Sequence, residues 1–559
     1  MRLINTTTLT LTEFHNPAST PPYAILSHTW SENAADEVTF QQFTTIPHAT
    51  LAQTQPLGFA KIQQTCRLAL DQGLNWAWVD TCCIDKSSSA ELTESINSMW
   101  RWYRAAEVCF AFLEDLELEG GLTVGEAVVD SETGGIDAAV RTRRSRRSSV
   151  ERTERRLELF GRCRWFTRGW TLQELIAPRW LEFHNSRWDF FGEKSSMSVA
   201  LSEITRIRAE VLRWDDPDAL LTISVAERMS WAAGRQTTRV EDAAYSLLGL
   251  FGVNMPLLYG EGDRAFIRLQ EEIIKESNDL SLFSWSIDNG RSADQTYWGI
   301  LAPSPREFAH CGNIETWVDP MHSSECTITS KGLRITPVPG GGLRPGPEGT
   351  GTYIMDLQCY RRGTEHQHRH LGVMLRQQGC DVYTRMRPDQ LYEAPLPSQK
   401  DKSRIFYVTK TVSLSGSALL RTSAMHALDL SRALETLATK WGFRPASKGA
   451  FEPEGHWDGQ RSMFLTRGMQ KFKCRVDLIR EDARGRPENR IALVCSTFRD
   501  TGHKQGAVAG VLVKFIDTAK PTRGRFASTQ MVGEVTPDWV GDKSSGVPIF
   551  MIEVHRKLG

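Results

Sequence analysis

Apolar, β-rich segments alternate with amphipathic helical segments in the first third of the chain, and this alternation constrains the fold more than any other feature. The β-rich segments are 22–28 (PYAILSH), 75–81 (NWAWVDT), 107–116 (EVCFAFLEDL) and 179–185 (RWLEFHN). A strand–helix–strand crossover is right-handed and brings its two strands into one parallel sheet. The pattern therefore predicts an α/β domain with a mainly parallel sheet.

Three helical segments lie between these strands. The segment 57–72 carries a single apolar face that ends before a glycine, made of Ile62, Cys66, Ala69 and Leu70. A second helix is expected from Ser88 to Arg104, and a short third one at TLQELIA, residues 171–177. The α/β domain is predicted to span residues 1–200.

The remaining residues divide into further parts, because 559 residues are too many for one hydrophobic core. Residues 201–290 have helical periodicity and are predicted to pack on the first domain. Residues 291–559 contain short β segments between Gly, Pro and charged turns, which predicts a β-rich sandwich or barrel. An insertion at about 117–156 ends in RTRRSRRSSVERTERR and is interpreted as a solvated excursion, with a localisation signal or polyanion site as the alternative.

Charge and cysteine content exclude several classes of protein. Lys plus Arg and Asp plus Glu both number 67, so neither nucleic acid nor a membrane surface is expected as partner. The longest apolar stretch, YSLLGLFGVNMPLLYG, is too interrupted to span a bilayer. Eleven scattered cysteines without a C-x-x-C motif argue against disulfides and structural zinc. We expect a reduced, cytoplasmic protein without a metal; the HQHRH segment at 366–370 is interpreted as a polar strand face.

Polar residues collect where the predicted strands end. Ligands of an open parallel sheet bind outside the carboxyl ends of its strands, and the helix bearing Glu174 should return to that edge. The candidate site residues are Ser27, His28, Trp30, Asp80, Cys82, Asp85, Trp170 and Glu174. Each has a structural alternative: Glu174 could pair with Arg164, Arg168 or Arg179, and His28 could be a hydrogen-bonded residue of a strand end. Asp80 and Asp85 could be caps, and Cys82 could be core.

Four long blocks of the sequence resemble a known family. PYAILSHTW, WVDTCCIDKSSSAELTESINSMWRWYRAAEVCFAFLED, RCRWFTRGWTLQELIAP and SVAERMSWAAGRQTTRVEDAAYSLLGLFGVNMPLLYGEGDRAFIRLQEEII resemble the fungal heterokaryon-incompatibility (HET) domain and its helical follow-on. The resemblance covers roughly residues 22–285. It implies a role in nonself recognition between fungal strains and in the regulated cell death that follows, with an unknown incompatibility partner protein.

HET domains in turn resemble Toll/interleukin-1 receptor (TIR) domains, which implies a doubly wound, TIR/flavodoxin-like sheet. WTLQEL (Trp170–Leu175) has the Trp-to-Glu spacing of the TIR element W-C-x-x-E-L, with Thr171 in place of Cys. In TIR enzymes this glutamate supports cleavage of the nicotinamide–ribose bond of NAD, so the resemblance makes Glu174 the candidate catalytic carboxylate. It implies NAD as a substrate, no required cofactor, and a homo-oligomer on activation.

The other candidates follow from the sheet edge alone. Trp30 or Trp170 could stack on a ring of a nucleotide ligand, and Ser27, His28 and Asp85 could bind hydroxyls or phosphate. Two other functions stay open. One is a non-catalytic signalling or scaffold module of the same fold that recruits partners. The other is a hydrolase using Cys82 or Cys83 with His28.

Overall fold

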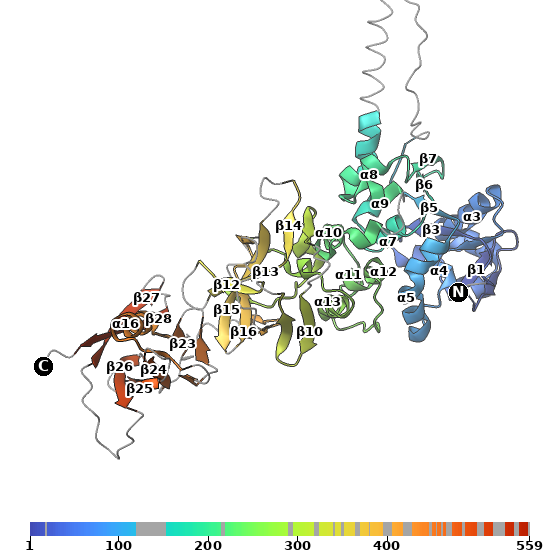
Figure 1. Ribbon diagram of the computed structural model, residues 1–559. Helices are drawn as coiled ribbons and strands as arrows, with labels where there is room; N and C mark the ends of the chain where they lie inside the picture. The colour runs from blue at the N-terminus through green and yellow to red at the C-terminus, as the bar shows by residue number, and fades with distance from the viewer. Residues whose placement is uncertain are drawn as a thin grey trace, which may run out of the picture. The chain divides into compact units, whose positions relative to one another are not determined.

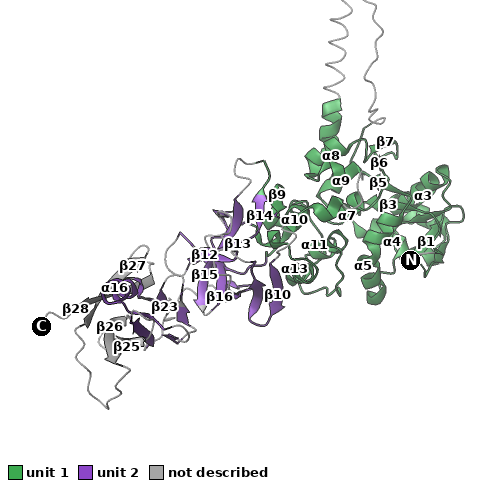
Figure 2. Ribbon diagram, in the orientation of Figure 1, with its two compact units in different colours: residues 1–285, 302–316, 361–365 green, residues 286–301, 317–360, 366–559 purple. Residues whose placement is uncertain are grey.

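The computed structural model divides the chain into two compact units, shown in Figure 2. Unit 1 comprises residues 1–285, 302–316 and 361–365, and unit 2 comprises 286–301, 317–360 and 366–559. The structure describes residues 1–556 except 17–18, 119–152, 214–218, 289–294, 318–323, 339–340, 348–351, 364–368, 380, 395–404, 417–426, 447–449, 454–455, 460–461, 466–471, 483–486, 500–507, 518–530 and 541–546. Most of the predicted basic insertion lies outside the described residues, and the predicted three-part division stays a prediction.

A seven-stranded mixed sheet forms the centre of the N-terminal part of unit 1 (Figure 1). Its strand order is β2-β1-β4-β3-β5-β6-β7. The strands are β1 (Arg2–Asn5), β2 (Leu11–Glu13), β3 (Ala24–His28), β4 (Trp76–Trp78), β5 (Val108–Phe112), β6 (Leu181–His184) and β7 (Phe190–Glu193). The four predicted strands are thus present as β3, β4, β5 and β6.

The sheet is parallel only in its centre. β3 runs parallel to both β4 and β5, and β5 runs parallel to β6. The pairs β1–β2, β1–β4 and β6–β7 are antiparallel. The expectation of a mainly parallel sheet therefore fails at both edges. The reason is connection length: β2 and β7 each follow their neighbour after a few residues, which allows a hairpin but no crossover.

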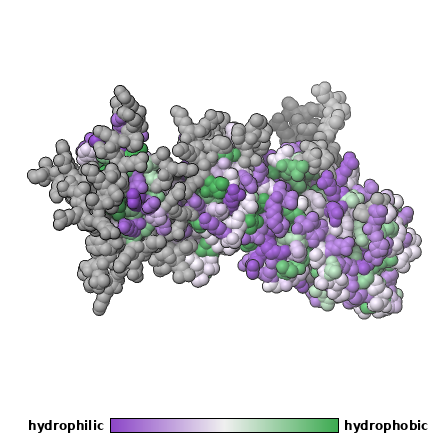
Figure 3. Space-filling view, turned by 60° about the horizontal axis from the view of Figure 1, so that its bottom comes forward, coloured by the Kyte–Doolittle hydropathy of each residue, from purple (hydrophilic) through white to green (hydrophobic). Residues whose placement is uncertain are grey.

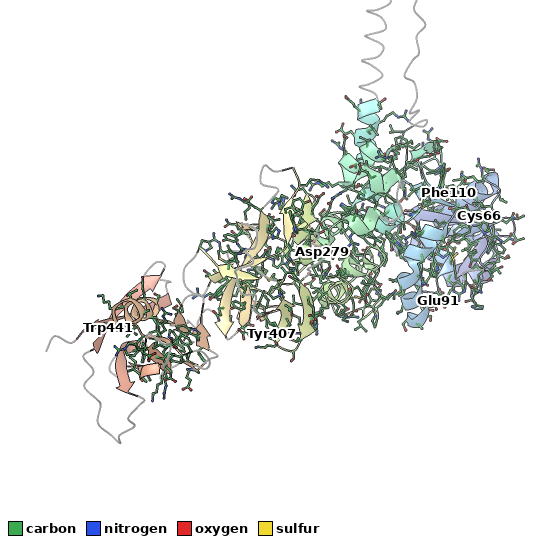
Figure 4. The ribbon with its side chains drawn as sticks, in the orientation of Figure 1. Cys66, Glu91, Phe110, Asp279, Tyr407 and Trp441 are labelled. Carbon is green, nitrogen blue, oxygen red and sulfur yellow. The ribbon has the colours of Figure 1, made fainter. Side chains whose placement is uncertain are left out.

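Helices α3 (Pro56–Asp71) and α5 (Ser89–Ala105) supply the crossovers on either side of β4. Their apolar faces agree with the predicted ones, since Ile62, Cys66 and Ala69 of α3 are buried. Leu70 differs, because it is 41% exposed in the last turn of α3. Figure 4 labels Cys66 and Phe110, both buried, which mark α3 and β5. The core of this part lies between the central strands and these helices.

Short helices follow the sheet and complete unit 1. Its further helices are α1 (Phe40–Thr45), α2 (His48–Thr54), α4 (Asp80–Cys83), α7 (Thr171–Ile176), α8 (Ser198–Thr205), α9 (Ala209–Arg213), α10 (Val225–Ser230), α11 (Asp242–Tyr245), α12 (Leu248–Phe251) and α13 (Arg264–Glu276). On α13, Phe266, Leu269, Ile273 and Ile274 are buried, as the helical periodicity of this segment predicts. Gly249 of α12 lies against the Trp100 side chain of α5, so α12 contacts α5 within unit 1.

Unit 2 is rich in strands. One sheet has the path β10-β11-β18-β16-β15-β13-β12, formed by β10 (Glu325–Thr329), β11 (Gly332–Thr336), β18 (Phe406–Val408), β16 (Val382–Met386), β15 (His370–Gly379), β13 (Thr352–Asp356) and β12 (Leu343–Pro345). Long antiparallel partners farther along the chain are β24 (Lys473–Glu481) with β25 (Pro487–Arg499), and β27 (Met531–Val540) with β28 (Val547–Arg556). The strand-rich character is confirmed, whereas the sandwich or barrel stays a prediction.

A helix in unit 2 was missed by the sequence analysis. α16 (Ser431–Trp441) ends at Gly442, whose φ of 70° lies in the left-handed region that glycine adopts at low cost. Its Ala433 and Leu437 are buried in one cluster with Val476 and Leu493 of the neighbouring strands. This 11-residue amphipathic segment lies among many β segments, and the sequence analysis included it in the β-rich region.

The surface, the helices and the His, Cys, Asp and Glu side chains bear on possible membrane and metal binding. Figure 3 shows hydrophilic residues interspersed with small hydrophobic patches on the face in view. Within the described residues, no helix is both long and apolar enough to cross a bilayer. These residues also hold no cluster of three His, Cys, Asp or Glu side chains suited to a metal. Of the HQHRH histidines, His366 and His368 lie outside the described residues, and His370 Nδ1 lies 2.9 Å from an Asp356 carboxylate oxygen.

Candidate functional site

A cavity of about 800 Å³ opens at the carboxyl end of β3, within unit 1. This volume is typical of sites for small organic ligands. The wall includes residues after β3, residues after β4, one face of α5, the turn that leads into α7, and the segment that leads into α11. Among the predicted site residues, His28, Trp30, Asp80, Trp170 and Glu174 line this cavity.

Glu174 lies on α7 and lines the cavity. Its side chain is nearly buried, with 6% of the residue exposed. Ser27 Oγ of β3 donates a hydrogen bond to Glu174 Oε2 (2.5 Å), and Trp165 Nε1 donates to Ser27 Oγ (2.8 Å). Ser27 itself is fully buried behind the acid and does not line the cavity. The predicted edge therefore brings Ser27 and Glu174 together, with Ser27 as the support of the carboxyl group.

Burial controls the protonation of Glu174. Loss of solvent raises the pKa of Glu174 to about 8, although the hydrogen bond from Ser27 acts in the opposite direction. The nearby Asp80 carboxylate adds to the increase. Glu174 is therefore mainly a neutral acid at pH 7 in the ligand-free site, and a cationic ligand beside it would favour the carboxylate.

Guanidinium pairing does not explain Glu174. Arg164 pairs with Glu32 (2.9 Å), and both terminal nitrogens of Arg168 lie 3.3 Å from Thr238 Oγ1. Within the described part of the chain, Glu174 has no ion pair at 4.0 Å or less. The alternative that Glu174 is held by Arg164, Arg168 or Arg179 is therefore wrong for the described residues.

Arg235 is the cation that influences Glu174 from a distance. Its guanidinium donates to the Arg168 carbonyl (2.9 Å), to Thr171 Oγ1 (2.9 Å) and to the Trp231 carbonyl (3.2 Å). Burial lowers the pKa of Arg235 to about 9, and the charge of Glu174 opposes that shift. Arg235 thus fastens the first turn of α7 and favours the ionised form of Glu174 without pairing with it.

Asp80 also lines the cavity and is the centre of a group of polar contacts. One carboxylate oxygen lies 3.0 Å from His28 Nε2, and the other accepts from Trp30 Nε1 (3.0 Å) and Lys86 Nζ (3.2 Å). The Lys86 ammonium also lies 3.6 Å from the centre of the Trp30 ring. Burial by itself would raise the pKa of Asp80, but Lys86 and His28 outweigh it and hold that pKa well below its usual range.

Cys82 and Asp85 do not reach the cavity. The Cys82 thiol is buried 3.9 Å from the Val79 carbonyl, and burial raises its pKa well above the usual range. Asp85 accepts hydrogen bonds from the backbone and hydroxyl of Ser87 (3.0 and 2.6 Å), as a turn-forming aspartate does. The proposed Cys–His arrangement therefore has no support, because a nucleophilic cysteine must be ionised and accessible.

Several residues of the site were missed by the sequence analysis. Tyr103, Asp242 and Tyr259 line the cavity, and Arg235 supports it. Tyr103 was recognised only as part of an apolar helix face. The other three lie more than 60 residues after Trp170, in a helical segment with no motif that pointed to a ligand, so no signal in the sequence could have found them.

Comparisons with known proteins agree with the sequence pattern. Residues 23–174 match the family described as "Heterokaryon incompatibility protein (HET)". The chain is also 39% identical, over 262 residues, to "Vegetative incompatibility protein HET-E-1" of Podospora anserina. That similarity covers 47% of this chain and 17% of the relative, so the chain spans a minor part of the relative's length. No solved structure matches the chain.

Proposed function

Because residues 23–174 match the HET family, we propose that this chain acts in heterokaryon incompatibility, as a protein of nonself recognition that triggers regulated cell death. The similarity to the vegetative incompatibility protein supports the biological role. The unknown incompatibility partner and assembly into a homo-oligomer on activation belong to the same proposal.

We further propose that the cavity cleaves the nicotinamide–ribose bond of NAD, as in TIR enzymes. The central strands lie in the order β4-β3-β5-β6, which is second, first, third and fourth along the chain. Flavodoxin-like sheets begin with this order and bind ligands where it reverses, between the first and third strands. The observation that carries the proposal is the buried Glu174 carboxyl group in a cavity at this place, hydrogen-bonded to Ser27.

The chemistry matches the environment of Glu174. The bond from ribose C1 to the nicotinamide nitrogen breaks, and its electron pair neutralises the pyridinium, so no strong acid is needed. Water adds to the ribose carbon and loses a proton, which gives ADP-ribose and nicotinamide. The transition state resembles an oxocarbenium ion. A carboxylate in a site that excludes water stabilises that charge by a few kcal/mol, and the positive ring of NAD⁺ would itself favour ionised Glu174.

One observation favours the non-catalytic alternative. The hydrogen bond between Ser27 and Glu174 joins β3 to α7, which is what a purely structural carboxyl group would do. In that case the domain would act by recruiting partners, and Glu174 would be needed for folding only.

The test is to incubate the purified protein at high concentration with NAD and to measure free nicotinamide. Glu174→Gln preserves the shape and the acceptor for Ser27, so it should still fold and melt cooperatively and lose at least about 100-fold in rate. Asp85→Asn, outside the cavity, is the matched control and should retain activity. Equal lethality of Glu174→Gln and the parent in cells, with no nicotinamide from either, would establish the scaffold function instead.

A further inference from the structure

The segment that precedes α11 is fastened to the loop that precedes α7. Gln236 N donates to the Thr167 carbonyl (2.6 Å), and Gly169 N donates to the Gln236 carbonyl (2.9 Å). A Cβ atom on Gly169 would lie 2.5 Å from Thr237 Cγ2. Glycine at this position is therefore what allows the two segments to approach, and the approach carries residues 238–242 to the cavity beside Trp170.

Asp242 holds two aromatic side chains at this wall of the cavity. Trp170 Nε1 donates to Asp242 Oδ2 (3.3 Å), and the Tyr259 hydroxyl donates to Asp242 Oδ1 (2.9 Å). Tyr259 also packs edge-on against the buried Tyr245, with ring centres 5.4 Å apart. Both rings line the cavity and have their polar atoms already bonded. Rings fixed in this way lose little conformational freedom when a flat ligand stacks on them.

Two guanidinium groups accompany these rings. Arg239 lies over the Tyr259 ring, with its Cζ 4.4 Å from the ring centre. Within the described residues, the Arg239 side chain makes no hydrogen bond or ion pair, so its five N–H donors are available. Arg168 lines the same wall, and among the described residues its guanidinium is held by the long contacts to Thr238. Guanidinium groups bind phosphate oxygens in bidentate fashion.

From this arrangement we infer that Trp170, Tyr259, Arg168 and Arg239 form a subsite for the base and phosphates of an adenine nucleotide. This subsite rests on the proposed function for the identity of its dinucleotide, since it would hold the ADP part of NAD while the nicotinamide ribose faces Glu174. Half of the subsite, Arg239 and Tyr259, lies beyond residues 23–174, the extent of the family match. The helical segment after the HET domain is then part of the binding site and not only a support.

Binding of ADP-ribose and ADP to the full chain, measured by isothermal titration calorimetry, tests this inference without catalysis. Asp242→Ala releases both rings and should weaken both ligands at least tenfold. Arg239→Gln should weaken ADP more than adenosine, because it removes a phosphate contact. Asp71→Ala, an exposed acid on α3 outside the cavity, is the matched control and should bind as the parent does.

A second pair of variants separates binding from misfolding. Gly169→Ala should weaken ADP-ribose because the new methyl group pushes Thr237 away. Gly169→Ala combined with Thr237→Ser removes the opposing Cγ2 atom and should restore the affinity, at an unchanged melting temperature. Weak binding that the second change does not rescue would count against the inference.

The outcomes also distinguish this inference from the proposed function. ADP binding that depends on Asp242, in a protein that releases no nicotinamide from NAD, would support the subsite and reject the NAD cleavage. Nicotinamide release whose KM for NAD is unchanged in Asp242→Ala, with unchanged ADP affinity, would reject the subsite and leave the cleavage standing. Absence of ADP and ADP-ribose binding at millimolar concentration in the parent would overturn the subsite outright.

Discussion

Glu174 and Asp80, two carboxyl groups that line the cavity, lie in opposite environments. Glu174 is buried against a serine hydroxyl, and its pKa is raised to about 8. Asp80 is surrounded by Lys86, His28 and the Trp30 indole, and its pKa is lowered. Two acids of similar intrinsic strength thus differ in charge at neutral pH because of their neighbours. Pairs of titratable groups with pKa values driven apart are typical of sites that bind or transform a ligand.

The largest effect on stability should come from removing Asp80, the ionised one of the two carboxyl groups. Asp80→Ala leaves Lys86 and His28 without their carboxylate, and breaking a buried ion pair costs about 3 kcal/mol. We expect a loss of that order in the free energy of unfolding, measured by urea denaturation at pH 7. Asp85→Ala is the matched control, since the Asp85 carboxylate accepts hydrogen bonds from Ser87 and from Gln41 of α1, and its loss should cost about 1 kcal/mol. Equal losses in the two variants would show that the Asp80 cluster has no special energetic role.

The contributions of Glu174 and Asp80 to the free energy of unfolding should depend on pH in opposite directions. The pKa of Glu174 is raised in the folded state, so its contribution to stability is complete below its unfolded value of 4.5 and is lost as the pH rises through about 8. The pKa of Asp80 is lowered, so its contribution is present above 3.8 and is lost in stronger acid.

The measurement is the free energy of unfolding of the parent and of Glu174→Gln across this range. The variant lacks the titration, so it should gain stability relative to the parent between pH 5 and pH 8.5. A constant difference between the two proteins would contradict the raised pKa of Glu174.

The rate of nicotinamide release should depend on the protonation state of Glu174. If Glu174 acts as a carboxylate, kcat/KM at low NAD rises with pH and levels off near the pKa of about 8. A change of one pH unit below that value then changes the rate about tenfold. A rate that is independent of pH between 6 and 8 would separate Glu174 from the chemistry.

The smallest expected effect is that of substituting Arg235 on the pH dependence of the rate. Arg235 favours ionised Glu174 through its charge, so Arg235→Gln should move the midpoint of the pH–rate curve upward by less than about one pH unit. Arg235→Lys keeps the charge and should restore the midpoint even if it lowers the rate. A structural role alone would lower the rate in both variants and leave the midpoint unchanged.

The sequence predicted the part of this cavity at the sheet edge well and the part formed by residues 235–259 poorly. Glu174, Ser27, His28 and Asp80 were found because chain order places their segments at one edge of a parallel sheet. Asp242 and Tyr259 come from a segment that reaches the cavity only through tertiary packing beside Gly169, which no local pattern encodes. The predictions that Cys82 and Asp85 belong to the site were wrong for a related reason. A position after a strand does not determine the direction in which the side chain points. The antiparallel edge strands were missed because short hairpins adjoin the longer alternation of strands and helices. α16 was missed because it is a single helix within a long series of β segments.

The close approach at Gly169 has a consequence for how such chains can be recombined. One wall of the cavity is encoded partly near residue 170 and partly near residue 240, and a hydrogen-bonded contact between Gly169 and Gln236 sets the spacing of the two segments. A chimera joined between these positions would take each segment from a different parent. Its cavity would close properly only where glycine in one parent meets a compatible small side chain in the other, so inheritance of the two segments should be linked.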